Sequence, residues 1–113
     1  MILIYLASPY TNSDPKILEE NVKRSMEVGD KLIKLGYAPY LPLLTHYQHL
    51  IYPQSYDMWL NLGLEMVKRC DMLLRLEGTS KGADIEVALA LKLGKPVAYS
   101  IEDLRQKAII EHY

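Results

Sequence analysis

The sequence is poor in residue types that specific classes of protein need. It has no phenylalanine and one tryptophan, and its 113 residues include one cysteine, Cys70. A lone cysteine forms no internal disulfide. No apolar run is long enough to span a bilayer, and no amino-terminal segment combines a basic start with a long apolar run. We therefore expect a soluble protein of the reducing cytoplasm.

Charge of either sign is not in excess. Thirteen Lys and Arg residues oppose 14 Asp and Glu residues, so the net charge is -1. This balance favours neither a nucleic-acid polymer nor a membrane as a partner. No linker or repeat interrupts the chain, so residues 1–113 are expected to form a single domain. Because an α/β domain of this length is small and carries a tyrosine-rich loop, we expect a homodimer or a larger homo-oligomer.

Apolar runs that favour strands alternate with segments of helical periodicity. The strand-like runs are 2–7, 37–42, 72–76 and 96–99, and the helical segments are 15–35, 57–69, 83–93 and 101–110. Residues 43–56 are expected to form a long irregular loop. Repeated strand-helix-strand units predict an α/β, flavodoxin-like or Rossmann-like three-layer fold with a four- to five-stranded parallel sheet. In the flavodoxin-like order, loops 8–12 and 78–82 flank the ligand crevice.

The clearest functional signal is the junction at residues 80–86, which reads SKGADIE. It follows a strand-like run and opens a helical segment, which is where parallel sheets bind ligands. We expect Glu86 in the first turn of that helix, where the helix dipole favours an ionised carboxylate. Such a group suits a nucleophile, a general base or an acceptor for a sugar hydroxyl. The alternative is that Glu86 only complements the dipole.

Several segments carry a resemblance to a known family. They are residues 4–10 (IYLASPY), 70–74 (CDMLL), 80–86 (SxGxxxE) and 94–96 (GKP). In this order and spacing the chain resembles the nucleoside 2-deoxyribosyltransferase superfamily, especially its small bacterial and phage branch. The likeness extends from Ile2 to about Tyr99, and implies that residues 1–113 form a single nucleoside 2-deoxyribosyltransferase-like domain.

The resemblance also implies roles for particular residues. Glu86 corresponds to the family's catalytic glutamate, which attacks the anomeric carbon of a nucleoside and releases the base, and Tyr5 to a tyrosine near that glutamate. A carboxylate at that carbon stabilises an oxocarbenium-like state or forms a covalent intermediate. The expected partner is a small-molecule nucleoside or nucleotide, with no cofactor and no metal. The expected substrate-binding residues are Ser8, Pro9, Tyr10, Asp57, Asn61, Ser80 and Gly82.

One position departs from the family pattern. The family has an aspartate on the helix before the third strand that helps the base to leave, and the corresponding residue here is Gly63. Glu65 lies about 200° around the helix from Gly63 and is no simple substitute. Base exchange, hydrolysis, and nucleotide binding without turnover therefore remain open. A phosphoribohydrolase ranks last, because residues 78–82 are only a thin version of its glycine-rich phosphate loop.

Other chemistry-bearing residues favour simpler interpretations. His46 and His49 have no third ligand at close spacing, so we expect them to line a pocket or face water rather than hold a metal. Trp59 favours core or interface packing over contact with a base. Asp71 is expected to be structural, since it opens a strand at the end away from the ligand edge. Cys70 is expected to be buried, because only Lys68 and Arg69 beside it would favour a reactive thiol.

Overall fold

A computed structural model describes residues 1–111, which contain a parallel sheet of four strands in the order β2-β1-β3-β4. The strands are β1 (Leu3–Ala7), β2 (Ala38–Tyr40), β3 (Met72–Arg75) and β4 (Val97–Ala98). The order places β3 beside β1 and leaves β2 at an edge, as the sequence predicts. The α/β, flavodoxin-like fold class is therefore confirmed.

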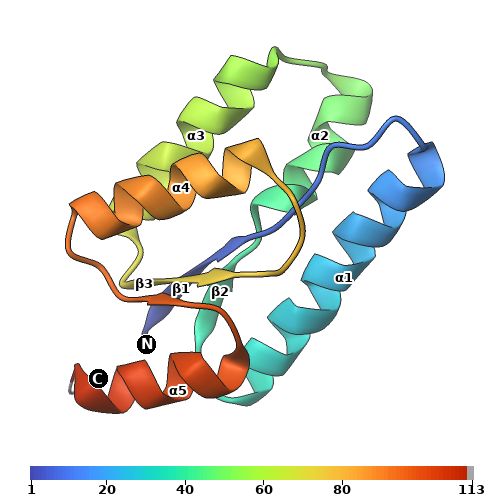
Figure 1. Cartoon of the computed structure of the whole chain (residues 1–113). Coiled ribbons are helices and arrows are strands. Elements are labelled where there is room, and N and C mark those ends of the chain that lie inside the picture. The colour runs from blue at the N-terminus through green and yellow to red at the C-terminus, as the bar shows by residue number, and fades with distance from the viewer. Residues whose placement is uncertain (112–113) are drawn as a thin grey trace.

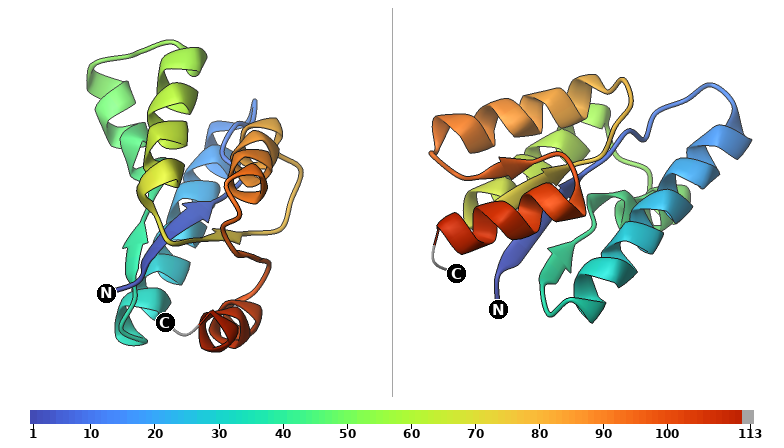
Figure 2. Two further views of the ribbon diagram at one scale, coloured as in Figure 1. Left: turned by 90° about the vertical axis from the view of Figure 1, so that its left-hand side faces the viewer. Right: turned by 60° about the horizontal axis from the view of Figure 1, so that its bottom comes forward.

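Helices cover both faces of the sheet (Figure 1). Helices α3 (Tyr56–Arg69) and α4 (Lys81–Lys92) lie on one face, and α1 (Pro15–Lys34) and α5 (Ile101–Ile110) lie on the other. Figure 2 shows the same three layers from two further directions. None of the described helices combines the length and the apolar character that crossing a membrane requires.

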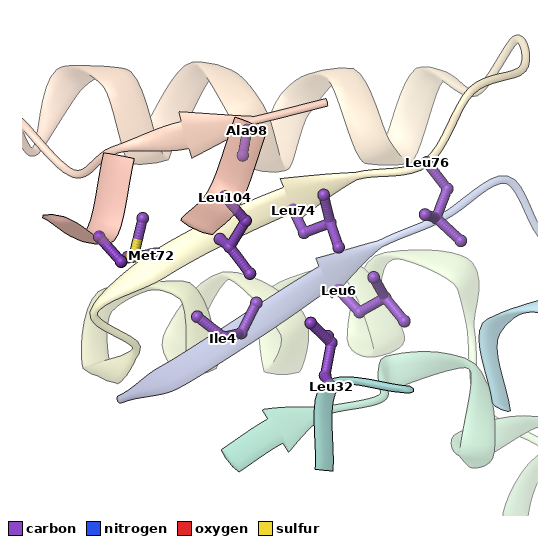
Figure 3. Close-up of a cluster of buried hydrophobic side chains, with 9 residues drawn as sticks. Ile4, Leu6, Leu32, Met72, Leu74, Leu76, Ala98 and Leu104 are labelled. Atoms are coloured by element: carbon purple, nitrogen blue, oxygen red, sulfur yellow. The ribbon is translucent and has the colours of Figure 1, made fainter. Parts of the chain in front are cut away.

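The alternation of side chains along β1 divides the core between the two faces. Ile4 and Leu6 pack with Met72, Leu74, Leu32 and Leu104, which form the cluster toward α1 and α5 (Figure 3). Tyr5 and Ala7 point the other way, into the cluster beneath α3 and α4. Because β1 is buried on both faces, Tyr5 carries its hydroxyl into the interior rather than to solvent.

Side chains cap the starts of α1 and α5. The carboxylate of Asp14 accepts from the backbone N–H of Lys16, and Pro15 begins α1. The hydroxyl of Ser100 accepts from the N–H of Asp103, whose carboxylate accepts in turn from the N–H of Tyr99. These contacts satisfy N–H groups that have no partner inside a helix.

The prediction of an irregular loop at residues 43–56 is wrong for the first half of that segment. A short 3₁₀ turn, η1 (Pro42–Leu44), leads directly into a helix, α2 (Thr45–Ile51). Leu43 and His46 are three residues apart and both are buried, so helical spacing turns them to one side. This periodicity is short, and the neighbouring aromatic and proline residues mask it in the sequence.

Shortening a buried side chain in β3 tests this account of the core. Leu74 is fully buried between the layers, whereas Leu91 on α4 is 60% exposed. We expect Leu74→Ala to lower the free energy of unfolding by about 2–5 kcal/mol, the usual cost of a buried leucine. Leu91→Ala should cost well under about 1 kcal/mol. Urea denaturation measures both, and equal losses would contradict the assignment of Leu74 to the core.

Candidate active site

A cavity of about 590 Å³ opens at the carboxyl ends of β1 and β3. Its walls come from the loop after β1, from η1 and α2, from the start of α3, and from the loop and helix after β3. This is the crevice position that the strand order predicts. The sequence-predicted residues that line it are Tyr5, Ser8, Tyr10, Ser80, Gly82 and Glu86.

The structure does not bring the other three predicted site residues into the cavity wall. Asp57 and Asn61 are exposed on α3. Pro9 packs instead against the loop after β3, where a Cβ added at Gly78 would lie 2.9 Å from the Pro9 Cγ. Gly78 also has a φ of +119°, which disfavours any side chain. The contact between Pro9 and Gly78 therefore holds the two cavity loops together.

The cavity wall also contains residues that were not predicted to bind substrate. His46 and His49 from α2 and Trp59 from α3 line it, together with Thr79 and Lys81. The indole N–H of Trp59 donates to Nδ1 of His49 at 2.8 Å. Of the two alternatives predicted for the histidines, lining a pocket and facing water, the structure shows the first. The sequence prediction missed the helix α2 that carries them, and their spacing of three residues is the signal that could have found it.

Glu86 lies deeper in the fold than the sequence predicts. Ser80 caps α4 by accepting from the N–H of Ala83, so the helix begins at Lys81 and Asp84 is the acid of its first turn. Glu86 therefore lies beyond the first turn, and the expected favourable contact with the helix dipole is wrong. Its side chain is buried, and its Oε2 accepts a hydrogen bond from the hydroxyl of Tyr5.

Burial dominates the electrostatics of this pair. Desolvation raises the pKa of Glu86 to about 7, although the hydrogen bond from Tyr5 and the charge of Arg75 both act to lower it. Burial and the nearby Glu86 charge raise the pKa of Tyr5, so its hydroxyl stays protonated and donates. A carboxyl group that titrates near neutral pH inside a cavity is typical of catalytic sites.

The absence of a side chain at Gly63 leaves the space that the Tyr5–Glu86 pair occupies. A Cβ at this position would lie 2.6 Å from the Tyr5 hydroxyl oxygen and 2.9 Å from the Oε2 of Glu86. Atoms that close would have to move. The position at which the resemblance expects an aspartate therefore faces the proposed nucleophile directly, and any side chain there would displace the Tyr5–Glu86 contact.

A buried arginine fixes the loop that leads into α4. Arg75, the last residue of β3, donates to the carbonyl of Gly78 at 2.8 Å and to the carboxylate of Asp84 at 3.0 Å. It also donates to the carbonyl of Leu76. Because one guanidinium holds both the loop and the first turn of α4, Ser80 and Glu86 are presented to the cavity from a rigid support.

A second set of hydrogen-bonded side chains lies in the cavity wall, with His46 at its centre. The hydroxyl of Tyr10 lies 2.7 Å from Nδ1 of His46, and Nε2 of His46 lies 3.1 Å from a carboxylate oxygen of Glu19 on α1. The amide of Asn21 donates to the carbonyl of Tyr10 at 3.2 Å. The loop after β1, α1 and α2 thus meet at this histidine.

The remaining predictions concern structural residues and metal ligands. Asp71 accepts from the N–H of Leu3 at 2.8 Å, and Cys70 is buried, with its pKa raised to about 11 by burial. Both are structural, as predicted. Among residues 1–111, no three potential metal-ligating side chains lie close enough together to hold an ion.

The fold resembles that of a known enzyme. The chain is similar to a 2-deoxyribosyltransferase from the psychrotolerant bacterium Bacillus psychrosaccharolyticus, with 27% sequence identity and a TM-score of 0.61. The match covers 84% of this chain and 69% of the other. That enzyme is described as a biocatalyst for nucleoside synthesis. This likeness suggests the nucleoside 2-deoxyribosyltransferase superfamily.

The sequence comparisons add a family but no activity. No curated protein matches the chain. Residues 2–100 match a family described as a domain of unknown function, DUF7768. This match spans both loops of the cavity and the Tyr5–Glu86 pair that they surround. The protein therefore belongs to the DUF7768 family.

Proposed function

We propose that this protein cleaves the N-glycosidic bond of a nucleoside or nucleotide, with Glu86 as the nucleophile. One observation carries the proposal: Glu86 is a buried carboxyl group in the cavity wall, bonded to Tyr5, at the ligand edge of the sheet. The likeness to a 2-deoxyribosyltransferase supports the same class of reaction. The chemistry needs only protein side chains and a small-molecule substrate.

The proposed reaction has two steps. A carboxylate oxygen of Glu86 attacks the anomeric carbon as the base leaves, which forms a glycosyl-enzyme intermediate through an oxocarbenium-like state. Water then completes hydrolysis, or a second base completes transfer. Tyr5 orients Glu86 through their hydrogen bond and so acts as a positioning residue for the attack. Ser80 and Gly82, at the start of α4, contact the sugar or its phosphate in this proposal.

A second candidate is a nucleotide-binding module without turnover. Gly63 favours it, because α3 presents no carboxylate to the leaving base at this position. A homo-oligomeric assembly and a cytoplasmic location stay predictions from the sequence. The experiment below separates turnover from binding, because bound nucleotide that is never cleaved leaves no free base.

Removal of the proposed nucleophile should abolish base release. Wild type, Glu86→Gln and Glu86→Ala are incubated with nucleosides and 5′-monophosphates, and free base is measured by chromatography. We expect release by the wild type alone, since neither variant has a carboxylate to attack. Glu102→Gln, which neutralises an exposed acid on α5, is the matched control and should retain activity. Equal release by wild type and Glu86→Gln would refute the nucleophile. No release by the wild type, with binding seen in calorimetry, would favour the binding module.

The pH profile should report the ionisation of Glu86. The carboxyl group attacks only when ionised and its pKa is about 7, so kcat/KM should rise with pH through the neutral range. The hydrogen bond from Tyr5 lowers this pKa, so Tyr5→Phe should shift the rising limb to higher pH and reduce kcat/KM by roughly 10²-fold. Initial-rate measurements across that range provide the check. A rising limb that stays in place in Tyr5→Phe would contradict the assignment.

A methyl group at position 63 should disturb the pair without removing either partner. The added Cβ of Gly63→Ala would meet both the Tyr5 hydroxyl and the Glu86 carboxylate. We expect a loss of about 1–3 kcal/mol in stability, as in overpacked cores. Displacement of the nucleophile by about 1 Å should lower kcat/KM on the order of 10²-fold.

Gly29→Ala is the matched control for this substitution. Gly29 lies in α1, and neither it nor Leu41 lines the cavity. The Cβ added at Gly29 would lie 2.8 Å from Cδ1 of Leu41. It should therefore cost stability while leaving kcat/KM near the wild-type value. Thermal unfolding and base-release assays measure the two properties separately. Full activity in Gly63→Ala would show that the Tyr5–Glu86 contact does not govern catalysis.

A further inference from the structure

A chain of hydrogen bonds runs from the cavity to solvent through His46. Tyr10 and His46 both line the cavity, and the Tyr10 hydroxyl lies 2.7 Å from Nδ1 of His46. Nε2 of His46 lies 3.1 Å from Glu19, whose side chain is 40% exposed, whereas that of His46 is 7% exposed. A cavity hydroxyl, a buried imidazole and a partly exposed carboxylate are thus connected in series by hydrogen bonds. Such a series can serve as a proton relay.

The carboxylate end of this chain is fixed on both of its oxygens. Oε2 of Glu19 faces His46, and Oε1 accepts from the hydroxyl of Tyr47 at 3.3 Å. Burial first, and the Glu19 charge second, raise the pKa of Tyr10, so its hydroxyl carries a proton at neutral pH. Because a carboxylate accepts hydrogen bonds, Glu19 holds the Nε2–H of His46 and leaves Nδ1 to exchange a proton with Tyr10.

The proposed reaction needs such a proton. A base that leaves from a glycosidic bond carries the bonding electron pair and must be protonated, and Gly63 offers nothing to supply the proton. We propose, resting on the proposed function, that Tyr10 is the general acid that protonates the leaving base, with His46 and Glu19 as its relay. The Tyr10–His46–Glu19 relay then takes the role for which the family resemblance expects an aspartate on α3.

The proton balance closes over the two steps. As the bond from C1′ to the base nitrogen breaks, its electron pair stays on the base, and an oxygen of Glu86 bonds to C1′. The base takes the proton of Tyr10, and the Tyr10 oxygen takes the Nδ1 proton of the His46 imidazolium. In the second step, water attacks C1′, the bond to Glu86 breaks, and the proton released by water returns through Tyr10 to His46. The relay therefore ends as it began.

The same positions of the heavy atoms serve both states of the relay. When His46 is neutral, Tyr10 donates to Nδ1, and when it is an imidazolium, Nδ1 donates to Tyr10 and frees the phenolic proton for the cavity. Nε2 keeps its proton and its contact with Glu19 throughout. No side chain has to move during the proton transfer, and this lowers its cost.

The test uses substrates that differ in how much protonation their leaving base requires. Base release is measured for 2′-deoxyguanosine against its 7-methyl derivative, and for 2′-deoxyuridine against its 5-fluoro derivative, or for the ribosides where the wild type prefers them. The 7-methyl purine is already cationic and leaves without a proton, and the 5-fluoro base leaves more readily than uracil. We expect Tyr10→Phe to lower kcat/KM about 10²-fold or more on the unmodified nucleosides, as loss of a general acid does. The loss should be much smaller on the modified ones.

The controls separate this relay from packing and from the proposed function itself. His46→Gln keeps hydrogen-bonding groups but carries no transferable proton, so it should show the same dependence on the leaving base. Tyr99→Phe makes the same chemical change at a tyrosine that is 60% exposed and outside the cavity wall, and should behave as the wild type. An equal loss on modified and unmodified substrates, or no loss, in folded Tyr10→Phe overturns the relay while base release by the wild type upholds the proposed function. No base release by the wild type from any substrate overturns both.

Discussion

Burial of the Glu86 carboxyl group against the Tyr5 hydroxyl is the constraint on which the candidate site depends. Burial raises the pKa of Glu86 to about 7, and the hydrogen bond from Tyr5 limits that rise. Three elements have to meet to create the contact: β1 supplies Tyr5, α4 supplies Glu86, and α3 supplies the open space at Gly63. A carboxyl group held in this way is close to ionisation and already oriented toward the cavity, which suits a nucleophile.

The fold builds this contact on the central strands of the sheet and on the loop that Arg75 holds. The parallel pairing of β1 with β3 brings their carboxyl ends together, and Arg75 then holds the loop after β3 and the first turn of α4. Across the crevice, Pro9 packs against Gly78 and joins the two loops. The cavity thus has one wall on the sheet and α4, and a second wall on α2, where His46 connects the loop after β1 to α1.

In the proposed reaction, the two walls of the cavity have different roles. The Tyr5–Glu86 side carries the buried carboxyl group, and on the other side hydrogen bonds connect Tyr10 through His46 to the partly exposed Glu19. Membership of the DUF7768 family describes the chain without assigning an activity, and the likeness to a 2-deoxyribosyltransferase indicates the class of substrate to test first. Glycine at position 63 fits this arrangement, because a larger residue there would displace the Glu86 carboxyl group.

The sequence by itself determined the α/β class, the strand order and the junction that carries Glu86, because apolar periodicity and capping residues such as Asp14 act over short distances. It did not reveal α2, since the helical spacing of Leu43 and His46 is too short to stand out among aromatic neighbours. It also placed Glu86 in the first turn of α4 and predicted an ionised group. Only the tertiary structure decided the pKa of Glu86, the place of Gly63 and the partners of Tyr10, because burial and contacts between distant residues do not exist until the layers pack.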